Sequence, residues 1–306
     1  MNYRHAYHAG NFGDVLKHVV LMLCLQHLKR KETPFRVIDT HAGPGRYSLD
    51  RTEAAKTEEW RGGIGRLFGP DAEPLPEQLA TLLAPYFALL RAENPDGGLT
   101  VYPGSPVLAQ AALRPSDALV ANELHPEDVA ILKAVLAKDK LCKVSNLDGY
   151  AALKALLPPR ERRGVVLIDP PFEQPGELVR MTEALSEAVK RFATGIYILW
   201  YPIKDEKPIT RFYRGLLDVT SAGGLPPPLK VEVLLRPLRN PLLLNGAGIA
   251  IINPPYQLEQ ELEILLPMLA DRFGADGKGS FRLALADSDM ATESRPTQPF
   301  RPAHKR

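Results

Sequence analysis

Short apolar segments alternate with helical ones along most of this chain, and this alternation limits the possible fold more than any other feature. Seven short runs rich in Val, Ile and Leu end at polar residues or glycine, as buried strands do. They are residues 35–39, 118–122, 142–146, 165–168, 196–200, 230–235 and 248–252. Strands that alternate with helices form a mostly parallel sheet with right-handed crossovers. The sequence therefore predicts an α/β fold in which the last two strands pair antiparallel.

One region interrupts the alternation. Residues 51–99 contain two helical stretches joined by a proline-rich link and show no strand pattern. We therefore expect a helical insertion at 51–99 inside a domain formed by residues 1–50 and 100–286. The polar, basic tail at 287–306 is expected to be disordered. The first helix is expected to run from an N-cap at Asp14 to about Lys31.

The composition is that of an ordinary globular chain, with 45% hydrophobic residues and a net charge of +2. The apolar run at 19–25 is far shorter than the ~20 residues of a membrane span, and the N-terminus lacks a signal-peptide pattern. Cys24 and Cys142 fit buried thiols in a reducing cytosol. Basic clusters at 29–31, 160–163 and 295–306 allow nucleic-acid binding, although solvated surface charge explains them as well.

Glycines follow the first strand directly, in Asp39-Thr40-His41-Ala42-Gly43-Pro44-Gly45. Without a Cβ, glycine lets the backbone come close to a ligand, and ligands of open α/β sheets bind beyond the carboxyl ends of the strands. A tight turn without a ligand explains these residues equally well. Ser48 stands where the dinucleotide fingerprint has its third glycine, which argues against a nicotinamide cofactor.

Carboxylates end the next two strands. Glu123 can accept hydrogen bonds from both hydroxyls of a ribose, and Asp148, followed by Gly149, can bind the amino group of an adenine. Either acid alone could equally be a surface carboxylate. Together they favour a nucleoside cofactor. Seven strands with a terminal antiparallel pair are also the number found in the methyltransferase version of the Rossmann fold.

The segment Asp169-Pro170-Pro171-Phe172 follows the fourth strand and matches the (Asp/Asn)-Pro-Pro-(aromatic) motif of amino-group methyltransferases. The amino nitrogen of adenine or cytosine is a poor nucleophile, because its lone pair is delocalised into the ring. Asp169 and the Pro170 carbonyl can accept its N–H bonds and so direct the lone pair towards a methyl group. The prolines stiffen the loop, and Phe172 offers a face on which a flipped base can stack. A rigid loop without a catalytic role is the less favoured interpretation.

A second copy of the motif, Asn253-Pro254-Pro255-Tyr256, follows the last strand. The Asp169 copy is favoured, because in a doubly wound order the fourth strand lies next to the strand that carries the glycine turn. Asn253 comes after the last strand, where no further sheet can be built around it. We therefore predict that the Asn253 copy is structural.

The N-terminal segment 3–11 is rich in aromatic residues and histidines. Tyr3 and Arg4 can contact a base and a phosphate, and Lys17 and His18 on the first helix can touch a cofactor. An ordered cap on the sheet explains the segment equally well. No metal site is predicted, because no cysteine pair accompanies the histidines.

These stretches together resemble the ribosomal large subunit methyltransferase J family, bacterial enzymes that make N6-methyladenine in 23S ribosomal RNA. The resemblance covers nearly the whole folded region. The matching stretches are 3–11, 14–18, 39–47, 102–106, 123–126, 148–149, 169–171 and 191–197.

The resemblance implies that the cofactor is S-adenosylmethionine, that Asp169 is the catalytic acid/base and that Tyr3 meets the RNA. It also implies the helical insertion. It places six residues in the cofactor pocket, namely His18, His41, Ser105, Glu123, Asp148 and Gly149. Lys17, Gly43 and Asp169 complete the expected set. Phe172 stands where the family often has tyrosine, and the tail after 286 has no counterpart.

We therefore predict methylation of adenine N6 in 23S ribosomal RNA, with Asp169, Pro170 and Phe172 acting on a flipped-out base. The expected substrate is protein-free RNA or an early assembly intermediate, and the expected location is the cytoplasm, without membrane or stable protein partners. The alternatives are a DNA adenine or cytosine methyltransferase, a protein-glutamine methyltransferase, and a non-catalytic RNA-binding assembly factor. No separate DNA-reading domain is visible, which lowers the first of these.

Overall fold

The computed structural model describes residues 5–50, 56–286 and 295–296. Its main sheet has nine strands in the order β5-β4-β1-β6-β7-β9-β8-β10-β11. Their bounds are β1 Arg36–Asp39, β4 Ala118–Asn122, β5 Cys142–Ser145, β6 Gly164–Ile168, β7 Ile196–Ile203, β8 Leu229–Leu234, β9 Gly246–Ile252, β10 Ser280–Leu285 and β11 Arg295–Pro296.

The direction of the strands confirms the expected α/β fold. β5, β4, β1, β6 and β7 are mutually parallel, and β9 lies antiparallel between β7 and β8. All seven expected strands are present, and the last two of them pair antiparallel. β10 and β11 were not expected; they extend the sheet beyond β8 by antiparallel pairing. The rest of the predicted tail at 287–306 lies outside the described residues.

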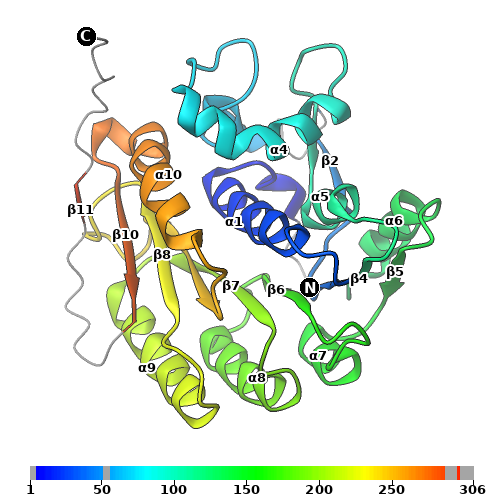
Figure 1. Cartoon of the computed structure of the whole chain (residues 1–306). Coiled ribbons are helices and arrows are strands. Elements are labelled where there is room, and N and C mark those ends of the chain that lie inside the picture. The colour runs from blue at the N-terminus through cyan, green and yellow to red at the C-terminus, as the bar shows by residue number, and fades with distance from the viewer. Residues whose placement is uncertain (1–4, 51–55, 287–294, 297–306) are drawn as a thin grey trace.

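Helices cover both faces of the sheet (Figure 1). One core cluster joins α1, α5, α6 and α10 to the sheet, and a second joins it to α7, α8 and α9. Side chains alternate between the clusters along each central strand: Val37 and Ile38 of β1 face opposite sides, as do Val165 and Val166 of β6. The helices are α1 Phe12–Lys29, α5 Ser105–Ala112, α6 Pro126–Leu136, α7 Gly149–Leu156, α8 Glu177–Arg191, α9 Glu206–Ala222 and α10 Leu258–Phe273.

The first helix begins earlier than expected. α1 starts at Phe12, and its N-cap is Asn11, whose side chain accepts a hydrogen bond from the Asp14 backbone N–H at 3.0 Å. The prediction of Asp14 as N-cap is therefore wrong. Because Asn11 satisfies the end of the helix, the Asp14 carboxylate is free for other partners. It is buried, with 3% of its surface exposed.

The described part of the region between β2 (Arg46–Ser48) and β3 (Val101–Pro103) is mainly helical. It contains α3 (Glu59–Gly62), a 3-10 turn η2 (Ile64–Arg66) and α4 (Glu77–Glu93), and it is closed by a small two-stranded sheet of β2 and β3. The Ile64 backbone N–H donates to the Gly10 carbonyl at 2.9 Å. A Cβ at Gly63 would lie 2.2 Å from that carbonyl oxygen, so close packing here requires glycine. The insertion thus lies directly against the segment that leads into α1.

Two helices that had not been expected, α9 and α10, complete the two layers. In α9 the buried residues Ile209, Phe212, Tyr213 and Leu216 recur at helical spacing. None of the helices formed by the described residues is long and apolar enough to cross a membrane.

Candidate functional site

The carboxyl ends of β1, β4 and β6 meet at one edge of the sheet, because these strands are parallel neighbours. This edge is called the site edge below. Asp39, Glu123 and Asp169 lie at or directly after these strand ends. A ligand of an open α/β sheet binds at such an edge, where the strand order reverses.

Glu123 folds back onto the glycine turn after β1. Its Oε2 accepts a hydrogen bond from the Gly43 backbone N–H at 2.8 Å, and its Oε1 accepts one from the His125 backbone N–H at 2.7 Å. Burial raises the pKa of Glu123, although these N–H groups oppose the effect. Each carboxylate oxygen has a second lone pair. Glu123 therefore links the ends of β1 and β4 and can still accept two further hydrogen bonds.

Gly43 is required by its backbone conformation. Its φ of +63° lies in the left-handed region, and a Cβ there would come within 2.3 Å of the Tyr47 hydroxyl oxygen. The turn therefore presents bare backbone beside Glu123, as a bound nucleoside would need.

His41 is held in one tautomer beside the start of α7. The Thr40 hydroxyl donates to the Leu167 carbonyl at 2.9 Å, so at 2.8 Å it must accept from His41 Nδ1–H. Burial lowers the pKa of His41 to about 4, and Nε2 is left as an acceptor. A Cβ at Gly149 would lie 2.3 Å from this Nε2, so the glycine preserves the close approach. The structure thus brings His41 and Gly149 together.

Asp148 and Ser105 lie at the same edge. Asp148 is at the surface and Ser105 is buried. Asp148 caps α7 through bonds from the Tyr150 and Ala151 backbone N–H groups at 3.0 and 3.1 Å, and half of its side chain is exposed. Ser105 donates to Asp39 Oδ2 at 2.6 Å. Burial raises the pKa of Asp39 to about 6, against the opposing Ser105 bond. Asp39 had not been predicted as a site residue, although it ends β1.

A buried lysine joins the first helix to the motif loop. Lys17 Nζ donates to Asp169 Oδ2 at 2.5 Å and to Asp14 Oδ1 at 2.8 Å. Burial alone would lower the pKa of Lys17, but the two carboxylates outweigh it and the pKa lies well above its ordinary value. Lys17 is therefore a permanent cation. It fixes one oxygen of Asp169, while Oδ1 has no hydrogen-bond partner among the described residues.

Asp14 extends this chain of contacts to the N-terminal segment. Its Oδ2 accepts bonds from His5 Nε2 at 2.8 Å and from the Gly10 backbone N–H at 2.9 Å. Burial would raise the pKa of Asp14, but the charges of His5 and Lys17 hold it well below the usual range. Neither Asp14 nor His5 was among the predicted site residues. A carboxylate three residues before a lysine on one helix face was the available signal.

Phe172 and Trp200 form the apolar part of the site. Phe172 has a φ of +52°, and its ring meets Trp200 edge-on at 5.9 Å between centroids. A left-handed φ at a bulky residue is strained and is often found at functional loops. Trp200 Nε1 is buried without a hydrogen-bond partner among the described residues. Trp200 was expected only as the end of a strand.

Three further predicted residues, His18, Tyr3 and Arg4, are not among the contacts described so far. His18 is buried, its Nδ1 bonds the Tyr102 hydroxyl at 2.8 Å, and its Nε2 has no partner within the described part of the chain. Burial holds the pKa of His18 well below its ordinary value, so the ring is neutral. Tyr3 and Arg4 lie outside the described residues.

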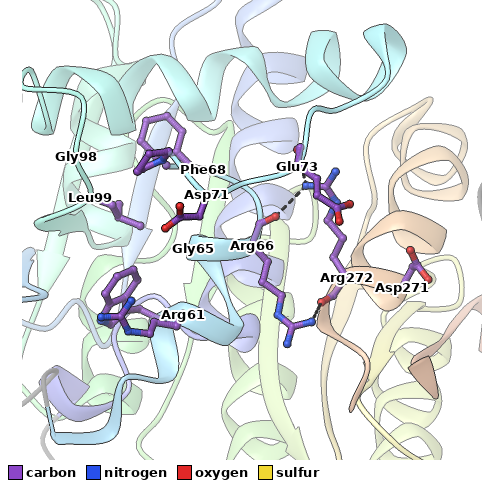
Figure 2. Close-up of a pocket in the computed structure, with 13 residues that line it drawn as sticks. Arg61, Gly65, Arg66, Phe68, Asp71, Glu73, Gly98, Leu99, Asp271 and Arg272 are labelled. Atoms are coloured by element: carbon purple, nitrogen blue, oxygen red, sulfur yellow. Dashed lines mark hydrogen bonds between the residues drawn. The ribbon is translucent and has the colours of Figure 1, made fainter. Parts of the chain in front are cut away.

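A separate hollow of about 570 Å³ lies between the insertion and the end of α10 (Figure 2). Arg66 and Arg272 each donate to the other's backbone carbonyl, at 2.7 and 2.8 Å, and Arg272 also donates to the Glu73 carbonyl. Three arginines and three acids line the hollow, so its charge is balanced. These bonds attach the insertion to α10, and none of the predicted site residues lines this hollow.

Comparisons with known proteins agree with one another. The family model described as ribosomal RNA large subunit methyltransferase D, RlmJ, matches residues 32–285. Two relatives are named ribosomal RNA large subunit methyltransferase J. The one from Haemophilus influenzae is 42% identical over 92% of this chain and 97% of its own length. The one from Escherichia coli is 40% identical over 91% and 96%.

A solved structure also matches this chain over most of its length. The protein LPL1258 from Legionella pneumophila shares 34% sequence identity with this chain and superposes with a TM-score of 0.82. The match covers 92% of this chain and 99% of the Legionella protein. The fold described above is therefore common to both proteins.

Proposed function

Because the chain belongs to the ribosomal RNA large subunit methyltransferase J family, we propose that it transfers a methyl group from S-adenosylmethionine to N6 of an adenine in 23S ribosomal RNA. The observation that carries the proposal is the contact between Lys17 and Asp169 at the end of β6. It presents a fixed carboxylate directly beside the strand with the glycine turn. A group that orients an amino nitrogen is needed at this position.

The residues around the glycine turn fit a nucleoside cofactor. Glu123 has lone pairs for two ribose hydroxyls, and the half-exposed Asp148 can accept from the adenine amino group. His41 offers Nε2 as an acceptor, and Gly43 and Gly149 keep the backbone close. Ser105, Lys17, His18 and Asp169 complete the proposed set. When bound, S-adenosylmethionine supplies a methyl group on a cationic sulfur, which departs as a neutral thioether.

Asp169 has the geometry of a group that orients the target amine. Lys17 occupies Oδ2, which leaves Oδ1 to accept one N–H of the adenine amino group, and the Pro170 carbonyl can accept the other. The nitrogen gains positive charge as it takes the methyl group, and Asp169 is placed to stabilise that charge or accept the proton. A fixed oxygen is more effective than a mobile one, because it needs no reorganisation during the reaction.

Phe172 provides the face on which the target base would stack. An aromatic stack of this kind contributes roughly 1–3 kcal/mol per base. This offsets part of the few kcal/mol needed to bring a base out of its stack. Trp200 supports Phe172 from the side. Tyr3 and Arg4 are proposed to meet the RNA near the flipped base.

The proposed substrate is protein-free 23S RNA or an early assembly intermediate, in which the target adenine is still accessible. No stable protein partner is needed for the chemistry. Such an enzyme would act in the cytoplasm.

The test measures methyl acceptors directly. The protein is incubated with radiolabelled S-adenosylmethionine and equal masses of protein-free 23S RNA, duplex DNA or ribosomal protein, and the labelled product is identified by nucleoside or amino-acid mass spectrometry. Label in N6-methyladenosine from RNA alone is expected. Label in DNA or in glutamine would show a different acceptor. Cofactor binding without transfer to any acceptor would show a non-catalytic protein.

A further inference from the structure

The loop between β8 and β9, residues 235–245, projects from the site edge of the sheet. β8 runs in the same direction as β7, so the carboxyl ends of both strands lie at this edge. Gly246 pairs with both Ile203 of β7 and Leu234 of β8, and Ile249 pairs with Trp200. The base of the loop is thus three residues, or about 10 Å, further along the sheet than Trp200.

The tip of this loop exposes large apolar side chains. Leu242 is 85% exposed and Leu243 is 43% exposed. Leu242 is the most exposed large hydrophobic side chain among the described residues. Leaving it in water is unfavourable, since burying a leucine contributes about 1.5–3 kcal/mol.

Hydrogen bonds hold the base of the loop and the turn that leads to its tip. Asn245 is fully buried, and its Nδ2 donates to the Lys204 carbonyl at 2.9 Å and to the Asn240 carbonyl at 2.8 Å. Asn240 Oδ1 in turn accepts from the Leu242 backbone N–H at 3.0 Å. This local turn fixes the direction in which the leucines leave the loop. A surface that is already ordered loses little entropy on binding.

The charge of the loop indicates its partner. Residues 235–245 contain Arg236 and Arg239 and no Asp or Glu. Arg239 is exposed, and so is Lys204 at the base of the loop. Cations beside an apolar tip fit a nucleic acid, whose phosphates and base faces they match. A purely apolar partner would gain nothing from the arginines.

We propose that Leu242 and Leu243 form an apolar wedge that enters the RNA base stack beside the target adenine and takes its place when the base swings into the site. Arg239 binds a flanking phosphate. The inference rests on the proposed function. Apolar wedges of this kind unstack adjacent bases in known nucleic-acid complexes. The separation of about 10 Å between Trp200 and the base of the loop corresponds to roughly three stacked nucleotides at ~3.4 Å each. The loop and the Phe172 face can therefore reach the same short stretch of RNA.

The test compares two RNA fragments that carry the methylated adenine once it has been mapped in 23S RNA. In the first fragment the adenine is stacked between its natural neighbours. In the second, both flanking nucleotides are abasic, so no stack has to be opened. The variants are the double substitution Leu242→Ala/Leu243→Ala and the matched control Leu285→Ala. Leu285 is 48% exposed and pairs with Leu229, at the opposite edge of the sheet.

The double variant is expected to lose about tenfold in kcat/KM on the stacked fragment and to match the wild type within about threefold on the abasic one, since only the first requires unstacking. Leu285→Ala is expected to stay within about twofold on both, because an exposed side chain away from the RNA makes little difference. Raising the salt concentration should weaken binding less for Arg239→Ala than for the wild type, because one phosphate contact is lost.

An equal loss of kcat/KM on both fragments, or no loss on either, would contradict the proposed wedge. It would not contradict the proposed methyltransferase function. Unchanged kcat/KM together with loss of a concentration-dependent dimer in the double variant would assign the leucines to a protein contact and would also contradict the proposed wedge. Failure of the wild type to methylate any RNA would instead refute the proposed function, and the wedge with it.

Discussion

Asp169-Pro170-Pro171-Phe172 and Asn253-Pro254-Pro255-Tyr256 are nearly the same tetrapeptide, and each follows a fully buried strand. They lie at opposite edges of the sheet, because β6 runs parallel to β1 and β9 runs antiparallel to β7. The Asp169 motif therefore lies at the site edge, beside the glycine turn. The Asn253 motif lies at the opposite edge of the sheet.

The side chains differ as much as the positions. Asp169 bonds the charged Lys17, whereas Asn253 donates to the Ala193 and Gly195 carbonyls at 2.7 and 2.8 Å. Phe172 packs on Trp200, whereas Tyr256 is 79% exposed. An amide that satisfies two backbone carbonyls is a structural tie. The contrast shows that strand direction decides what such a motif can do, and it supports the prediction that the Asn253 copy is structural.

The largest effect is expected from replacing the acid of the first motif. Asp169→Asn should lower kcat by about 10³-fold, because positioned acid–base groups contribute about 10²–10⁴. Asn253→Ala should leave kcat within about twofold and cost about 1 kcal/mol of stability through its lost hydrogen bonds. Single-turnover methylation and urea unfolding measure the two quantities. If Asn253→Ala lost activity as severely as Asp169→Asn, the contrast between the motifs would fail.

Removing the lysine that holds Asp169 should have the next largest effect. Breaking one side of a buried ion pair costs about 3–5 kcal/mol in stability. Lys17→Met should therefore unfold at lower urea and lose about 10²-fold in activity per folded molecule, since the Asp169 carboxylate is no longer fixed. Lys190→Met is the matched control, because its partner Glu187 is exposed. Full activity in folded Lys17→Met would show that Lys17 is not needed to position Asp169.

The free energy of unfolding should depend on pH through Asp39 at the site edge. Asn253, at the other edge, has no titratable side chain and adds no such dependence. The pKa of Asp39 is about 6 against an ordinary 3.8, a difference that corresponds to about 3 kcal/mol. Because the folded pKa is raised, the contribution of Asp39 to stability is fully present below pH ~3.8 and is lost as the pH rises through about 6. Relative to Asp39→Asn, the wild type should therefore become less stable between pH 4 and 6, and the gap should be constant above about pH 7. If the unfolding free energies of the wild type and Asp39→Asn differed by the same amount at every pH in this range, the raised pKa of buried Asp39 would be contradicted.

The smallest effect concerns the aromatic residue of each motif. Phe172→Tyr adds a hydroxyl but keeps the stacking face, so kcat/KM for RNA should change by less than about threefold. Tyr256→Phe should change nothing measurable, because the side chain is exposed and distant from the site edge. A loss of tenfold or more in Phe172→Tyr would show that a hydroxyl cannot be accommodated beside Trp200.

Much of the fold could be predicted, because periodicity and strand-end residues are local signals. The seven central strands were found in this way. α9 was not expected, although Ile209, Phe212 and Leu216 recur at helical spacing, so the signal was present in the sequence. β10 is less readable, since Phe281 is its only buried residue and its place depends on pairing with β8.

The site was predictable only in part, for the same reason. Glu123, Asp148 and Asp169 follow strands, and strand ends can be recognised locally. The contact between Lys17 and Asp169 joins residues 152 positions apart and depends on how α1 packs over β6. The partners of Asp14 are also hard to predict, because Asn11 and Asp14 are equally good N-cap residues and only the structure shows that Asn11 caps the helix. Long-range packing, not local preference, brings the charged cluster together.

The most direct measurement of the central claim uses cells that lack the protein. Their 23S RNA is digested to nucleosides and N6-methyladenosine is quantified by mass spectrometry after complementation with the wild type, Asp169→Asn or Asn253→Ala. The wild type and Asn253→Ala should restore the modified nucleoside, and Asp169→Asn should not. Full restoration by Asp169→Asn, or an unchanged amount of N6-methyladenosine without any copy of the protein, would contradict the account.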